Sequence, residues 1–212
     1  MSHTLHREGT LESLKDDICI VVRPERHING AGSAEKVRHI LDLMLKHHAS
    51  NYGDAYHYNK YDNSHEVIRD GISDGDSIFG VFATRDDAFA FLADMVEYDC
   101  GISLVLEGLY DDIKDMCHKV HIKPHTTNHS LGVWGKTEKL PPEEYRPLVT
   151  MCGHGMVPFR LIQDVEKDIR SGRITLREGA EKLAKPCACG IFNADRAEKL
   201  LVDLMKQLEI KK

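Results

Sequence analysis

The sequence predicts an α/β fold, with a central, mostly parallel sheet, a βαβα core and a C-terminal helical segment. Two observations lead to this prediction. Short, continuous apolar runs at 78–82 and 102–106 alternate with helical patterns at 85–97 and 109–120. Strands that alternate with helices are typical of parallel sheets with right-handed crossovers. After residue 150, helical patterns follow one another without an apolar strand between them.

The N-terminal elements follow from apolar spacing and from capping residues. The apolar run 18–23 predicts a strand that ends at Pro24. Ser33 is expected to cap the next helix and Thr84 to cap the helix over 85–97. The first of these helices has a core-facing stripe at helical spacing: Val37, Ile40, Leu41, Met44 and Leu45.

The C-terminal part is predicted to be mainly helical. Residues 148–152 are expected to form one more strand, and 157–171 a helix. Thr175 begins a capping box for a short helix, and Asn193 is expected to cap the last one. We therefore divide the chain into an α/β core over 1–150 and a helical segment over 151–212 that carries the cysteine motifs, the two packed as one compact unit.

Composition excludes several classes of protein. The 212 residues carry a formal net charge of −6, which argues against a general nucleic-acid-binding protein because phosphate contacts need a basic face. No apolar run reaches the roughly 18 residues of a membrane span. The first residues lack the apolar region of a secretory signal, so we expect a cytoplasmic protein. Six cysteines in that compartment indicate metal ligation or thiol chemistry rather than disulfides.

Two glycine-flanked segments hold three of the cysteines. The first is Thr-Met-Cys-Gly-His-Gly-Met over 150–156, and the second is Lys-Pro-Cys-Ala-Cys-Gly-Ile-Phe-Asn over 185–193. We expect each to lie at the start of a helix, where the partial positive charge favours a thiolate. Gly153 and Gly190 would let backbone amides approach a bulky anionic group. An αα-hairpin between the segments could bring the thiols to one point.

The predicted cofactor is an iron–sulfur cluster, most simply [4Fe-4S], bound by Cys152, Cys187 and Cys189. Cys100, beside Gly101 at a sheet edge, is the candidate fourth ligand. The alternative is a zinc site, which could use His154 with the same three thiolates. The Cys-x-Cys spacing differs from the Cys-x-x-Cys of zinc ribbons, and this argues against zinc.

Histidines supply the candidate acid–base groups. His154, flanked by glycines and two residues from Cys152, is expected to act at the same site. His125 and His129, in the irregular stretch 121–135, could line a pocket. Cys19, in an apolar strand, is expected only to pack in the core. The Tyr- and His-rich stretch 50–66 could be a lid or an oligomer contact.

These observations support three functional hypotheses. The first is an iron–sulfur lyase or oxidoreductase, with a small-molecule substrate bound between the cluster and the loop 121–135, or with a redox partner. The second is a zinc-binding regulatory or binding module without catalysis. The third is a thiol enzyme with Cys152 as nucleophile and His154 as base. Partners are expected to include neither nucleic acid nor membrane, and a homo-oligomer is left open.

Overall fold

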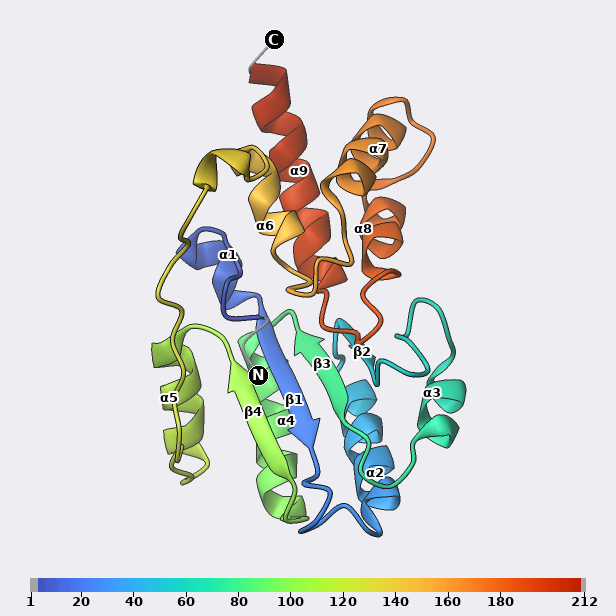
Figure 1. Ribbon diagram of the computed structural model, residues 1–212, viewed down its shortest axis with the longest axis vertical. Coiled ribbons are helices and arrows are strands. Elements are labelled where there is room, and N and C mark those ends of the chain that lie inside the picture. Colours follow the sequence, from blue (N-terminus) through green and yellow to red (C-terminus); the bar gives the residue numbers. More distant parts are fainter. Residues whose placement is uncertain (1–3, 211–212) are drawn as a thin grey trace.

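The computed structural model describes residues 4–210, in which helices surround one four-stranded sheet (Figure 1). The strands are β1 (Ile18–Arg23), β2 (Asn51–Gly53), β3 (Ile78–Phe82) and β4 (Ser103–Glu107). The helices that accompany the sheet are α1 (Leu11–Lys15), α2 (Ser33–Lys46), α3 (His65–Gly71), α4 (Arg85–Tyr98) and α5 (Tyr110–Lys119). The C-terminal elements are η1 (Thr137–Lys139), η2 (Glu143–Tyr145), α6 (Arg146–Val149), α7 (Phe159–Arg170), α8 (Leu176–Ala184) and α9 (Ala194–Ile210).

The sheet is antiparallel, so the prediction of a mostly parallel sheet is wrong. The strand order is β2-β3-β1-β4, and β1 is antiparallel to both of its neighbours. The predicted strand–helix–strand unit over 78–107 does exist, and its two strands run in the same direction. They do not pair with each other, however, because β1 lies between them. Apart from the additional helix α3 between β2 and β3, this βαββαβ order is the split arrangement of ferredoxin-like folds.

The burial of β1 explains the wrong prediction. Ile18 to Val22 are all buried, since both faces of the sheet are covered. A strand covered on both faces is a continuous apolar run, which is the usual signature of a parallel sheet. Here the second face of the sheet is covered by the C-terminal segment rather than by another crossover helix.

Two apolar clusters fill the space on either side of the sheet. Even-numbered residues of β1 face α2 and α4 and join one cluster, whose strand members include Ile18, Ile20, Val22, Ile78 and Phe82. Odd-numbered residues join a second cluster with α6 to α9, and its strand members are Cys19, Val21, Phe79 and Val81. The C-terminal helices stand at the end of the sheet where β1 begins (Figure 1).

Most predicted helices and caps are confirmed. Thr84 accepts from the N–H of Asp87 at the start of α4, and the capping box of Thr175 is complete. Asn193 Oδ1 accepts from the N–H of Arg196 in α9. Two details differ. Leu45 is half-exposed and Leu43 is buried in its place. Residues 146–149 form α6 rather than the start of a strand, and Pro147 at its first turn suits a helix.

Candidate metal centre

The structure brings Cys152, Cys187 and Cys189 together. Cys152 lies in the turn between α6 and α7, and the other two lie in the turn between α8 and α9. The sulfur atoms of Cys187 and Cys189 are 3.9 Å apart, and Cys189 Sγ is 3.9 Å from His154 Nδ1. Cys152 completes the group, since the Cys187 thiol is close enough to have the largest effect on its pKa. None of the three cysteines is more than 3% exposed.

Backbone amides point at the sulfurs in the same pattern in both turns. Cys152 accepts from the N–H groups of His154 and Met156, two and four residues ahead. The N–H of Ile191 is directed at both Cys187 and Cys189, again four and two residues ahead. Gly153 and Gly190 adopt φ of 71° and 80°, which let the chain curl around the sulfur. Such donors stabilise anionic sulfur.

These amides replace the helix N-termini that we expected. The nearest helix after Cys152 begins at Phe159, and the one after Cys189 begins at Ala194. A helix dipole acts only within its first turn. The predicted location of the thiols at helix starts is therefore wrong, although the glycines serve the predicted purpose of bringing amides close.

Contacts among the three thiols shift their pKa values in different directions. The neighbouring Cys187 thiol holds the pKa of Cys189 below its ordinary value, although burial opposes this. The contact with Cys152 lowers the pKa of Cys187, but the contact with Cys189 and burial raise that pKa to about 12. The contact with Cys187, together with burial, raises the pKa of Cys152 far above the ordinary range. Cys189 is therefore the thiol of this group whose environment most favours the thiolate.

The four donors form a chain from His154 through Cys189 and Cys187 to Cys152. As they stand, no three His, Cys, Asp or Glu side chains between residues 4 and 210 are grouped to hold a metal ion. Ligation by the three thiols requires them to turn toward a common point and to lose their protons. Metal binding and deprotonation of thiols are coupled in this way in any thiolate site.

The stretch 50–66 acts as a scaffold for this site. The buried Asn59 donates from Nδ2 to three carbonyls, those of Ala184 at 3.3 Å and of Lys185 and Cys187 at 3.0 Å. Gly190 packs directly on the backbone of Tyr52 and Gly53 in β2, with no space for a Cβ atom. Both contacts fix the Cys187–Cys189 turn against the sheet edge. The lid or oligomer contact suggested for this stretch is not tested by the structure.

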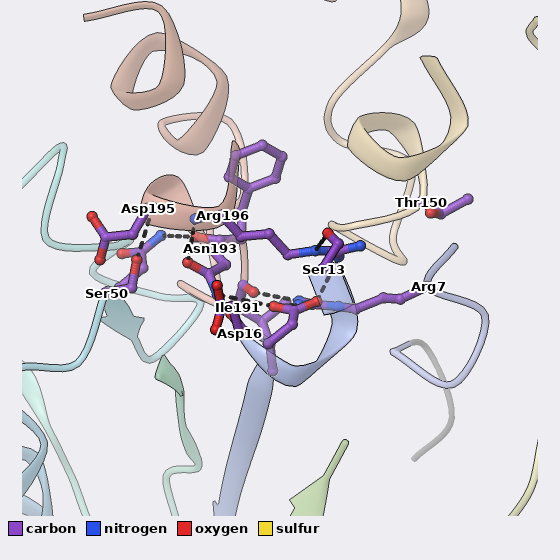
Figure 2. A network of polar contacts seen from close by, with 12 residues as sticks. Arg7, Ser13, Asp16, Ser50, Thr150, Ile191, Asn193, Asp195 and Arg196 are labelled. Atoms are coloured by element: carbon purple, nitrogen blue, oxygen red, sulfur yellow. Dashed lines mark hydrogen bonds and ion pairs between the residues drawn. The ribbon is translucent and has the colours of Figure 1, made fainter. Parts of the chain in front are cut away.

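A buried ionic network holds the same turn from the other side (Figure 2). Arg7 pairs with Asp17 and donates from Nη2 to the carbonyl of Ile191. Arg196, from α9, pairs with the second Asp17 oxygen at 2.7 Å. Asn193 Nδ2 donates to Asp17 Oδ1 at 3.1 Å. The N-terminal segment and α9 are thus joined beside the cysteine turn.

Sequence reasoning missed Asn59, Arg7 and Asp17 because they belong to no motif. Each is a single polar residue whose role depends on contacts with residues more than 100 positions away. A signal was present only for Asp17, which directly precedes an apolar strand. A carboxylate at such a position has to find a partner when the strand is buried.

The other predicted residues lie apart from the thiols. Cys100 precedes β4 at the opposite end of the sheet, where Ser103 pairs with the last residue of β1. It is therefore not the fourth donor in this arrangement. His125 is exposed and contacts Thr126. His129 lies against Tyr110, with ring centroids 5.6 Å apart.

Cys19 and Cys117 are buried outside the site. Burial raises the pKa of the Cys19 thiol well above its ordinary value, and it raises the pKa of Cys117 as well. Neutral thiols in apolar surroundings pack as small hydrophobic groups. Cys19 therefore has the environment expected for a packing residue.

Comparison of the chain with protein-family models, with curated proteins and with solved structures finds no match. Within the described part of the chain, no helix is both long and apolar enough to cross a lipid bilayer.

Proposed function

We propose that this protein binds a metal centre through the thiolates of Cys152, Cys187 and Cys189 and acts through that centre. The main support is the convergence of three thiols from two separate turns, each with amide donors directed at sulfur. A purely packing role would not explain these donors, because neutral buried thiols need no such stabilisation. All six cysteines are free, which agrees with a cytoplasmic location.

A single tetrahedral ion, with zinc as its ordinary form, agrees best with the sulfur separation. Two thiolates bound about 2.3 Å from one tetrahedral zinc ion lie about 3.8 Å apart. The Cys187 and Cys189 sulfurs are 3.9 Å apart. His154, 3.9 Å from Cys189 Sγ, supplies a fourth donor and would complete a Cys₃His set. Zinc would then organise the two turns, as expected of a binding or regulatory module.

An iron–sulfur cluster is the second candidate. It is supported by the number of cysteines in the group, because three thiolates bind three of the four irons of a [4Fe-4S] cluster. A cluster held by three thiolates leaves one iron open to a small-molecule substrate, which would make the protein a lyase or oxidoreductase. In a cluster each cysteine binds a different iron, so the sulfurs lie farther apart than on a single ion. The two turns would have to separate to admit it.

The thiol-enzyme hypothesis has the weakest support. A nucleophilic cysteine acts as its thiolate and has to be reached by substrate. Cys152 is fully buried, and its contact with Cys187 and burial raise its pKa. Cys189 has the lowered pKa but is also buried.

Metal analysis of protein purified without oxygen tests the proposal. One zinc per chain in a colourless protein would identify the single-ion site, whereas iron with acid-labile sulfide and visible absorption would identify the cluster. We expect Cys152→Ser, Cys187→Ser and Cys189→Ser each to lower the bound metal at least tenfold. Cys100→Ser is the matched control, since this half-buried cysteine lies at the other end of the sheet.

Two results would contradict the proposal. One is protein that contains no metal and gains none when zinc or iron and sulfide are supplied under reducing conditions. The other is full metal retention in the triple Cys→Ser variant, provided that its circular dichroism shows a folded protein. Loss of metal from the Cys100→Ser variant alone would show that the metal is bound elsewhere, at a site that includes Cys100.

A further inference from the structure

A second site lies next to the metal centre but is separate from it. A cavity of about 260 Å³ opens between the N-terminal segment, the Cys19–Glu107 end of the sheet and the loop 128–130. Its wall includes Thr4, Arg7, Asp17, Cys19, Glu107 and His129. This volume is slightly below that of a drug-sized ligand pocket, so the cavity suits a small metabolite.

Two buried polar atoms on its wall have no hydrogen-bond partner among the described residues. They are Arg7 Nε and Thr4 Oγ1. The Arg7 side chain and the Thr4 residue are each only 5% exposed. Buried polar groups in folded proteins are almost always paired, because an unpaired one lacks both water and a partner. Two such atoms at one cavity indicate that a ligand supplies the missing contacts.

The charges around Arg7 specify the kind of ligand. Arg7 and Arg196 are both buried and share the single carboxylate of Asp17. Two guanidinium groups and one carboxylate leave one positive charge in excess among these three side chains, and the Glu107 carboxylate on the same cavity wall balances it. Arg7 Nε can only donate a hydrogen bond, so its partner has to be an acceptor. A ligand carboxylate is such an acceptor, and its hydrogen bond to a guanidinium group is charge-assisted and therefore of the stronger kind.

We propose that this cavity binds a small monocarboxylic acid, with its carboxylate accepting from Arg7 Nε and Thr4 Oγ1. Glu107 on the same wall adds a carboxylate of its own. A second acidic group on the ligand would meet this negative charge, and like charges brought together oppose binding. The site therefore selects monocarboxylates over dicarboxylates. This inference does not depend on the identity or presence of the metal.

Binding to the whole protein as purified tests the inference. The probes are propionate and lactate, with lactamide as the uncharged analogue and malate as the dicarboxylate, and the measurement is isothermal titration calorimetry or ligand-observed NMR. We expect lactate or propionate to bind, and lactamide and malate to bind at least tenfold more weakly, since charge-assisted hydrogen bonds are lost or opposed.

Variants of Thr4 provide the decisive comparison, because its hydroxyl has no partner to lose in the free protein. Thr4→Val should weaken monocarboxylate binding about tenfold while leaving the midpoint of thermal unfolding unchanged or higher. Thr4→Ser keeps the hydroxyl and should keep the affinity. Thr127→Val, in the exposed part of the same loop and away from the cavity, is the matched control.

Three results would overturn the inference. The first is failure of both monocarboxylates to bind at concentrations up to about 50 mM, which is weaker than any specific small-ligand site. The second is equal binding of lactate and lactamide. The third is binding that Thr4→Val leaves unchanged. Because the metal is measured independently, failure here leaves the metal proposal standing, and the reverse also holds.

Discussion

Asn59 shows how much of the cysteine site depends on residues that do no chemistry. Its one amide group satisfies three carbonyls at the end of α8 and in the Cys187 turn. Its carbonyl oxygen accepts from the N–H of Tyr61 at 2.9 Å. The side chain therefore ties the stretch 50–66 to the C-terminal segment. Removing the donor would take this bond from all three carbonyls, of which those of Ala184 and Cys187 also accept from the N–H groups of Cys187 and Gly190.

We predict that Asn59→Asp lowers the free energy of unfolding by about 3 kcal/mol, because a buried carboxylate would face three carbonyls that it cannot bind. Urea unfolding at neutral pH measures this. Asn63→Asp is the control, since the half-buried Asn63 donates a single bond to the carbonyl of His57. Its cost should stay below about 1 kcal/mol. Equal effects of the two substitutions would contradict the role assigned to Asn59.

The cysteines themselves could be predicted from the sequence, and their supporting residues could not. Cys152, Cys187, Cys189 and His154 stand out because thiols and glycines recur in a short pattern. Asn59 and Arg7 have no pattern, since their function arises from folding across the whole chain. The same limit explains why Cys100 was wrongly predicted to be the fourth ligand. Its turn resembles a ligand position, but the order of the strands places it at the wrong end of the sheet.

Helix α2 is capped by a residue from another part of the chain. Gly32 at its N-cap offers no side chain, and Asp74, before β3, accepts from the N–H groups of Gly32 at 2.8 Å and Ala34 at 2.9 Å. Ser33 Oγ in turn accepts from the N–H of Gly75 at 2.8 Å. Helix α2 and the segment before β3 are thereby fixed to each other.

The cap leads to a pH-dependent prediction. The N–H groups of Ala34 and Gly32 hold the pKa of Asp74 below its ordinary value. A carboxylate with a lowered folded pKa stabilises the fold above its unfolded pKa of about 3.9 and loses this effect as the pH falls through the folded pKa. Asp74→Asn should therefore be less stable than the parent at pH 7, and the difference should shrink below about pH 4.

Urea unfolding of both proteins across this pH range is the measurement. Asp70→Asn is the control, because Asp70 is exposed and its recorded contact is a 3.6 Å ion pair with Arg69. It should not differ from the parent at any pH. A stability difference for Asp74→Asn that is constant down to the lowest pH at which both proteins fold would exclude the capping role.

Helices were easier to predict than strand pairing for a physical reason. A helix is stabilised by contacts within about four residues, so apolar spacing and caps such as Thr84 and Thr175 mark it locally. The direction of a strand depends on which distant strand lies beside it. Nothing in the residues 18–23 indicates that β1 inserts between β3 and β4, and β2 is only three residues long within a polar stretch.

The Arg7–Asp17–Arg196 network joins parts of the molecule that are far apart in sequence. It links the N-terminal segment, the start of β1 and α9 (Figure 2), and Arg7 also contacts the carbonyl of Ile191, which follows the cysteine turn. All three side chains are at most 5% exposed. A buried charge whose partner is removed destabilises a protein strongly, because neither water nor an opposite charge compensates it.

We predict that Asp17→Asn lowers the free energy of unfolding by about 3 to 5 kcal/mol. Asp16→Asn is a control in the adjacent position, since Asp16 forms an exposed ion pair with Lys199. It should change stability by less than about 1 kcal/mol. Chemical unfolding followed by both circular dichroism and Trp134 fluorescence measures the two. Similar small effects of both substitutions would mean that the buried network does not hold the molecule together.

The same network cannot form until late in the synthesis of the chain. Arg196 Nη2 donates to the carbonyl of Glu8, and these residues are 188 positions apart. At the usual speed of synthesis, roughly 10 to 40 seconds separate the emergence of the two. During that interval Arg7 can pair with Asp17 but Arg196 is absent, and Cys187 and Cys189 are not synthesised until near its end. A metal bound by all three cysteines can therefore be inserted only after Cys189 has emerged, long after the segment that contains Arg7.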